Sequence, residues 1–114
     1  MSKQFLRLSE VYNGSVNTTQ YIQVLDDESS TKLDNIGVQV NIGAGITGSV
    51  SLYASIDGVN YVAIGFTEGV ATLSGSADTF IFDLNQRPFI FLQCKITVDS
   101  GSGTVQILIS GAGL

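Results

Sequence analysis

Short runs in which apolar and polar residues alternate constrain this chain most. In residues 35–42, Ile36, Val38, Val40 and Ile42 alternate with small or polar residues. Successive side chains of a β-strand point to opposite faces, so this run predicts a strand with one buried face. Nowhere does a helical period of 3.6 residues persist for three turns. The sequence therefore predicts an all-β protein.

Clusters of Gly, Asn, Asp and Ser separate these runs, which is typical of short antiparallel strands. The length of 114 residues suits one domain. We predict a single antiparallel β-sandwich over residues 20–114, of jelly-roll or immunoglobulin-like type. Residues 1–19 have no firm strand signal, and we predict either an N-terminal arm or a first edge strand there. The expected strands, about eight, are residues 20–25, 35–42, 48–56, 59–66, 70–74, 78–84, 88–98 and 104–110.

The pair Asp57-Gly58 is the clearest turn signal in the chain. Both residue types accept the positive φ angles of a two-residue type I′ turn, so the pair predicts a hairpin between residues 49–56 and 59–64. Asn60 is the third residue assigned to this turn. The expected cross-strand pairs are Ile56 with Val59, Ala54 with Tyr61 and Leu52 with Ala63 on the inner side, and Tyr53 with Val62 on the outer side.

Several predicted strands are apolar on both faces. Tyr53, Val62 and Ile64 fall opposite the inner face of the hairpin, and Phe89 and Phe91 fall opposite the core face of their strand. No helix is predicted to cover them, so a loop, the N-terminal segment or another subunit must do so. The predicted contact residues for a second copy or a partner are Phe5, Leu6, Tyr53, Val62, Ile64, Phe89 and Phe91.

The charge balance excludes some classes of partner. The chain carries ten acidic and five basic residues, a net charge of -5 and a pI near 4.2. Nucleic acids and anionic membranes bind patches of Lys and Arg, which this composition does not provide. No apolar run approaches the ~20 residues that cross a bilayer, and the first residues do not form a signal peptide. We expect no nucleic acid or membrane partner, and synthesis in the cytoplasm.

The sequence contains no catalytic constellation. Histidine, the commonest general base and metal ligand, is absent. The single cysteine, Cys94, falls on the core side of its strand and is expected to be a buried apolar residue. Residues 43–45 (Gly-Ala-Gly) and 101–103 (Gly-Ser-Gly) open no helix, so we interpret them as hairpin connections and not as phosphate loops. We expect no enzymatic activity and no cofactor.

Two ligand classes stay open as alternatives. The acidic residues at 26–28 and 34 favour a solvated loop, and the competing hypothesis, calcium, lacks the spacing of an EF-hand. A carbohydrate-binding, adhesin-like β-sandwich that takes a host glycan is the alternative function. Trp, which has the largest flat apolar face, is absent. The aromatic residues that could stack on a sugar are Tyr12, Tyr21, Tyr53 and Tyr61.

A family resemblance covers residues 35–114. A hairpin motif at Ser55–Tyr61 precedes a strand that begins near Pro88, and the Ser/Gly turn at Gly101–Gly103 leads into a Thr-Val strand and a Gly-rich tail. In these motifs the chain resembles small β-sandwich structural proteins of tailed and related bacteriophages. The resemblance implies a virion component, such as a capsid decoration or cement protein or an accessory part of a head, tail or spike. It also implies homo-oligomerisation, binding to a capsid or tail protein, and synthesis in a host bacterium.

Overall fold

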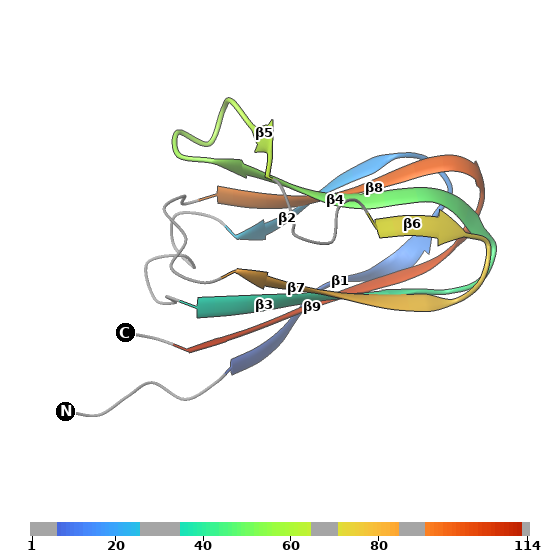
Figure 1. Cartoon of the computed structure of the whole chain (residues 1–114), viewed down its shortest axis with the longest axis horizontal. Coiled ribbons are helices and arrows are strands. Elements are labelled where there is room, and N and C mark those ends of the chain that lie inside the picture. The colour runs from blue at the N-terminus through green and yellow to red at the C-terminus, as the bar shows by residue number, and fades with distance from the viewer. Residues whose placement is uncertain (1–6, 26–34, 65–70, 85–90, 113–114) are drawn as a thin grey trace.

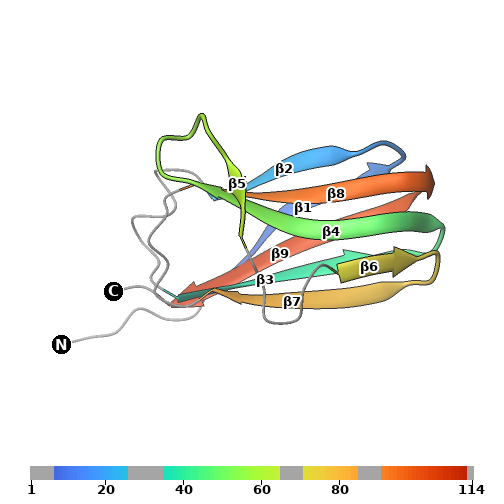
Figure 2. The same ribbon diagram turned by 45° about the horizontal axis from the view of Figure 1, so that its top comes forward.

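The structure, a computed structural model, describes residues 7–25, 35–64, 71–84 and 91–112. Within these ranges it contains nine strands and no helix. Two antiparallel sheets lie face to face (Figures 1 and 2), which confirms the predicted β-sandwich with nine strands in place of about eight. The strands are β1 (Arg7–Val16), β2 (Gln20–Leu25), β3 (Asn35–Ile42), β4 (Ile46–Ser55), β5 (Val62–Ala63), β6 (Ala71–Ser74), β7 (Asp78–Leu84), β8 (Phe91–Gly101) and β9 (Gly103–Ala112).

The strand pairs are nested within one another. Sheet A has the order β1-β9-β3-β7, and sheet B has the order β2-β8-β4-β5, with β6 also paired to β4. Strand β1 thus pairs with β9, β2 with β8, β3 with β7, and β4 with β6. The strands after β5 therefore pair with the strands before it in reverse order along the chain.

The core lies between the inner faces of the two sheets. All four apolar residues of the alternation in residues 35–42 are at most 3% exposed, which confirms the buried face of that strand. On β8, Leu92, Cys94 and Ile96 are completely buried. Burial raises the pKa of the Cys94 thiol to about 12, because an apolar environment disfavours the thiolate. Cys94 is thus a core residue, as expected.

Strand β1 forms one edge of sheet A. Arg7 to Val16 pair with β9, with a bulge between Glu10 and Tyr12. Residues 7–16 of the predicted N-terminal segment 1–19 are thus a strand at the edge of sheet A. Phe5 and Leu6, two of the predicted contact residues, lie outside the described residues.

The two-residue turn predicted at Asp57-Gly58 is wrong. Strand β4 ends at Ser55, and β5 comprises only Val62–Ala63. The connection therefore spans residues 56–61, which we call the Asp57 loop. The hydrogen bonds that the Asp57 carboxylate accepts within the loop account for its length.

The predicted register of this hairpin is wrong by one residue. Ala54 pairs with Val62 and not with Tyr61, and Tyr53 pairs with Ala63 and not with Val62. Because side chains alternate between faces, a shift of one residue moves every partner to the other face. The predicted pairs Ile56 with Val59 and Leu52 with Ala63 are likewise not among the pairs of β4 and β5.

Two glycine-rich connections, predicted as hairpins, instead cross between the sheets. Residues 43–45 lead from β3 in sheet A to β4 in sheet B, and residues 101–103 lead from β8 in sheet B to β9 in sheet A. The two crossings lie side by side, since the Gly43 N–H donates to the Thr104 carbonyl oxygen at 2.8 Å. The Ser102 N–H donates to the Gly45 carbonyl oxygen at 3.1 Å. A hairpin joins neighbours within one sheet, so the interpretation as hairpins is wrong.

Candidate functional site

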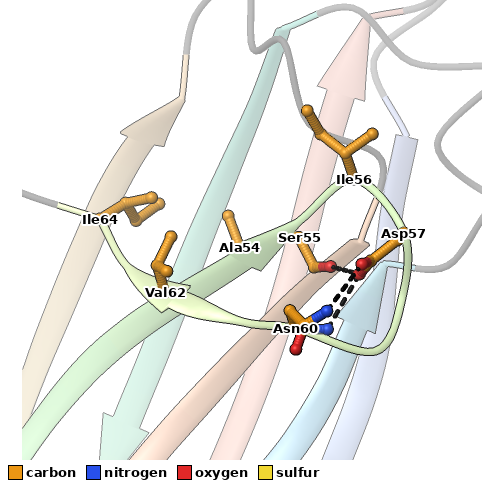
Figure 3. Close-up of a pocket in the computed structure, with 7 residues that line it drawn as sticks. All are labelled: Ala54, Ser55, Ile56, Asp57, Asn60, Val62 and Ile64. Carbon is orange, nitrogen blue, oxygen red and sulfur yellow. Dashed lines mark hydrogen bonds between the residues drawn. The ribbon is translucent and has the colours of Figure 1, made fainter.

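The Asp57 loop is organised around one carboxylate (Figure 3). Asp57 Oδ1 accepts hydrogen bonds from the backbone N–H groups of Val59 at 2.8 Å and Asn60 at 2.9 Å, and from Ser55 Oγ at 2.8 Å. Asp57 Oδ2 accepts one from Asn60 Nδ2 at 3.0 Å. The N–H of Gly58 donates to Ser55 Oγ at 2.9 Å. These bonds lower the pKa of Asp57 far below its ordinary value, with the backbone N–H of Asn60 contributing most.

This capping explains why the sequence prediction failed. The Asp57 side chain takes the role that a backbone carbonyl has in a two-residue turn, and a longer loop results. The three residues assigned to the turn, Asp57, Gly58 and Asn60, do lie in the connection between β4 and β5. The signal that could have indicated the longer loop is the spacing of Ser55, Asp57 and Asn60, which suits a side-chain cap.

The Asp57 loop folds over part of the outer face of sheet B. A β-carbon at Gly58 would lie 2.9 Å from Cζ of Phe91, so the Phe91 ring packs against the Gly58 backbone. At the other end of the loop, Gln23 Nε2 is 3.4 Å from the Tyr61 hydroxyl oxygen. Phe91, a predicted contact residue, is therefore half-buried and partly covered by its own chain.

Apolar side chains of the Asp57 loop and β5 are exposed to solvent. Ile56 is 68% exposed, Val59 79% and Val62 67%. Beside them lies an open hollow of about 530 Å³, shown in Figure 3, which we call the apolar hollow. Sequence reasoning missed Ile56 and Val59, because the predicted pairing placed them on the inner face. The residues that line the hollow are Ala54, Ser55, Ile56, Asp57, Asn60, Val62 and Ile64.

The predicted contact residues do not form one surface. Val62 and Ile64 line the apolar hollow, although Ile64 also packs against the core. Phe91 lies beneath the Asp57 loop, and Tyr53 lies farther along β4 in a separate cluster. Phe89, like Phe5 and Leu6, is outside the described residues, and so are the acidic residues at 26–28 and 34.

A cluster that includes Tyr53 occupies the outer face of sheet B. The rings of Tyr21 and Tyr53 meet edge to face, with centroids 6.0 Å apart and planes at 73°. Lys95 Nζ lies 5.2 Å from the Tyr21 centroid and 5.6 Å from the Tyr53 centroid. Hydrogen bonding to Tyr21 raises the pKa of Lys95, so its ammonium stays charged. Two cross-strand rows form this cluster, which we call the tyrosine face: Tyr21, Lys95 and Ser51, and next to them Gln23, Gln93 and Tyr53.

The outer face of sheet A has a different character. Thr79 Oγ1 donates to Asn41 Oδ1 at 3.0 Å, and Asn41 Nδ2 donates to Gln106 Oε1 at 2.9 Å. Gln106 Nε2 donates to Glu10 Oε2 at 2.7 Å, and Asn13 Nδ2 lies 3.4 Å from the same oxygen. This chain of hydrogen bonds crosses β7, β3, β9 and β1. These polar side chains already hydrogen-bond one another, which leaves fewer of their donors and acceptors available to a ligand.

The described residues contain neither a metal-binding cluster nor a membrane-spanning helix. Within the described ranges, no group of three or more His, Cys, Asp or Glu side chains could hold a metal ion. In the same part of the chain, no helix has the length and apolar character needed to span a bilayer. The calcium hypothesis concerns residues 26–28 and 34, which are not described, and it stays a prediction.

Comparisons with known proteins identify the fold. No protein-family model and no curated protein matches the sequence. The SPBc2 prophage-derived protein YomS has a similar structure, with a TM-score of 0.64, 9% identity and 97% of each chain covered. A chain of the Bacillus endospore appendages, described as a novel family of disulfide-linked pili, has a TM-score of 0.51 and 13% identity over 100% of this chain and 93% of its own. At such identities the likeness shows a shared fold.

Proposed function

We propose that this chain is a non-enzymatic structural subunit of a phage virion, such as a capsid decoration or cement protein or an accessory head or tail protein. It acts by associating with copies of itself and with a capsid or tail protein, and its place is the virion. The observation that carries the proposal is the apolar hollow, with the exposed side chains of Ile56, Val59 and Val62 beside it.

The topology and the structural neighbours support an assembly role. We interpret the nested strand pairs as the connectivity of a jelly roll, a fold that serves in viral capsids and in lectins. The two similar structures come from a prophage-derived protein and from pili. Both observations favour a subunit that works by binding rather than by catalysis. The jelly-roll connectivity also fits a place in the virion.

The chemistry of the apolar hollow suits burial against another protein. Burial of exposed aliphatic side chains contributes a favourable free energy of roughly 25 cal/mol for each Å² of apolar surface removed from water. The nearest charge, on Asp57, already accepts hydrogen bonds from its own loop. A partner that covers Ile56 and Val62 therefore leaves that carboxylate paired, which lowers the desolvation cost of the contact.

A charge placed in the hollow tests the proposal. We expect the wild-type chain to form an oligomer in native mass spectrometry, and Val62→Glu to shift it to the monomer with an unchanged melting temperature. Ile81→Glu is the matched control, because Ile81 is 65% exposed on β7 of the other sheet. A wild-type chain that stays monomeric and does not bind assembled phage heads or tails contradicts the proposal. The genes beside its own give a second test: capsid or tail genes support it, and polysaccharide enzymes favour the next candidate.

A carbohydrate-binding, adhesin-like module is the second candidate function. The observation that favours it is Tyr21, which is 55% exposed on the outer face of sheet B. Its partner is a host glycan. Reproducible binding on a glycan array that Tyr21→Ala abolishes supports this candidate.

A further inference from the structure

The tyrosine face has the shape of a shallow binding platform. Its six residues come from the adjacent strands β2, β8 and β4. Neighbouring strands lie about 4.8 Å apart, and side chains on one face repeat about every 7 Å along a strand, so the platform measures roughly 10 by 7 Å. This area is comparable to one or two pyranose rings.

The platform combines an exposed ring with a fixed positive charge. The apolar C–H face of a sugar packs on an aromatic ring, and Tyr21 is more than half exposed. Tyr53 contacts Tyr21 edge to face and so limits its rotation. The Lys95 ammonium is held near both rings. Among the side chains that the structure describes, Lys95 is the single basic one, in a chain of net charge -5.

Polar groups next to the rings complete the set of interactions. Gln93 Nε2 donates to Gln23 Oε1 at 3.1 Å, and this bond uses one of the two amide hydrogens of Gln93. The Ser51 hydroxyl stands opposite Lys95 in the same cross-strand row. An amide and a hydroxyl can each donate and accept, as sugar hydroxyls require.

We infer that the tyrosine face binds an acidic saccharide, with one sugar ring stacked on Tyr21 and a sugar carboxylate paired with Lys95 Nζ. Gln93 and Ser51 hydrogen-bond the hydroxyls of the sugar. The inference rests on the second candidate function and uses none of the residues that line the apolar hollow. A subunit could therefore assemble through the hollow and bind glycan through this face.

The charge of the platform separates an acidic saccharide from other ligands. A neutral sugar would stack on Tyr21 without using Lys95, whereas an ammonium–carboxylate hydrogen bond is about twice as strong as a neutral one. Single-stranded nucleic acid also stacks on aromatic rings, but it requires a basic groove along its backbone. One lysine on this face does not provide such a groove.

Paired glycans test the inference. The array carries oligosaccharides ending in sialic or uronic acid beside the same oligosaccharides without the acidic sugar. We expect the wild-type chain to bind the acidic members, with weaker binding at high salt. Lys95→Gln should reduce affinity about tenfold or more, to the level of the neutral counterparts. Tyr21→Ala should abolish binding, and Tyr21→Phe should preserve it.

Three controls make the result decisive. Thr72→Ala, at an exposed position of β6 in the same sheet, should bind like the wild type. Unchanged melting temperatures for Lys95→Gln and Tyr21→Phe show that the variants fold. Val62→Glu should still bind glycan, which separates this site from assembly. Three results would overturn the inference. The first is equal binding of acidic and neutral glycans that Lys95→Gln leaves unchanged. The others are binding of an acidic peptide in place of glycans, and no binding at all.

Discussion

The carbonyl oxygen of Gly45 lies against the α-carbon of Gly101, so closely that a β-carbon at Gly101 would overlap it. A β-carbon at Gly45 would in turn overlap the carbonyl oxygen of Ser102. Both glycines have a positive φ, 114° at Gly45 and 87° at Gly101. The two crossings between the sheets can therefore touch only because neither position carries a side chain.

Gly101→Ala is expected to destabilise the fold more than an ordinary glycine replacement. Gly75→Ala is the matched control, because Gly75 has a φ of 94° but its β-carbon would meet only Thr47 Cγ2 at 3.8 Å. The control should lose about 1–2 kcal/mol of unfolding free energy through its φ alone. Gly101→Ala should lose about 3 kcal/mol or more, because the backbone must also move. Urea unfolding followed by circular dichroism measures both, and equal losses would show that the crossings are not in contact.

Phe91→Ala should loosen the Asp57 loop. The half-buried ring supports Gly58, so its loss should cost about 1–2 kcal/mol of stability, less than for a fully buried Phe. Ile81→Ala, at an exposed position, should change stability by less than about 0.5 kcal/mol. Thermal unfolding gives both values, and the Gly58 amide resonance reports the loop directly. A Phe91 variant as stable as the Ile81 variant argues against this packing.

The pH dependence of the Asp57 loop follows from the lowered pKa of Asp57. A carboxyl group with a lowered pKa in the folded state stabilises that state fully above its ordinary pKa of 3.8. The contribution decreases as the pH falls from 3.8 through the folded pKa. We expect the Val59 and Asn60 amides to stay protected at pH 4 and to exchange faster in stronger acid. In Asp57→Asn these amides should exchange faster than in the wild type at pH 4 and above, where the wild-type carboxylate is ionised, and unchanged exchange there contradicts the capping role.

The Cys94 thiol should be unreactive in the folded protein. With a pKa of about 12, it carries almost no thiolate at pH 8, and no solvent reaches it. Unfolding returns its pKa to about 9.0, so stability should fall as the pH rises above 9. A disulfide reagent such as DTNB should therefore label the chain only under unfolding conditions. Rapid labelling of the native protein would place Cys94 outside the core.

Sequence patterns predicted the strands well and their connections poorly. The alternation in residues 35–42 depends only on the period of a strand and on burial, and it predicted the core face of β3 correctly. The glycine-rich segments at 43–45 and 101–103 look like hairpin turns, because a turn within a sheet and a crossing between sheets need the same residues. Only the pairing of β3 with β9 distinguishes the two cases.

The composition of the tyrosine face could not be predicted either. The sequence predicts a partner contact at Tyr53 and makes Tyr21 one of four candidate rings for stacking on a sugar, but nothing local connects them with Lys95. Their proximity depends on the pairing of β8 with both β2 and β4. The sequence does not mark Lys95 as a ligand residue, because one lysine in an alternating strand is typical of a solvated face.

Sheet A cannot close before the C-terminal strand has left the ribosome. Strand β9 lies between β1 and β3, with Gly111 opposite both Arg7 and Ile36. A nascent chain that lacks β9 leaves two strand edges exposed, and such edges pair readily with other chains. Pairing between distant segments also folds slowly. Strong overexpression raises the concentration of chains with exposed edges and should therefore yield inclusion bodies. Slower translation at low temperature should increase the soluble fraction.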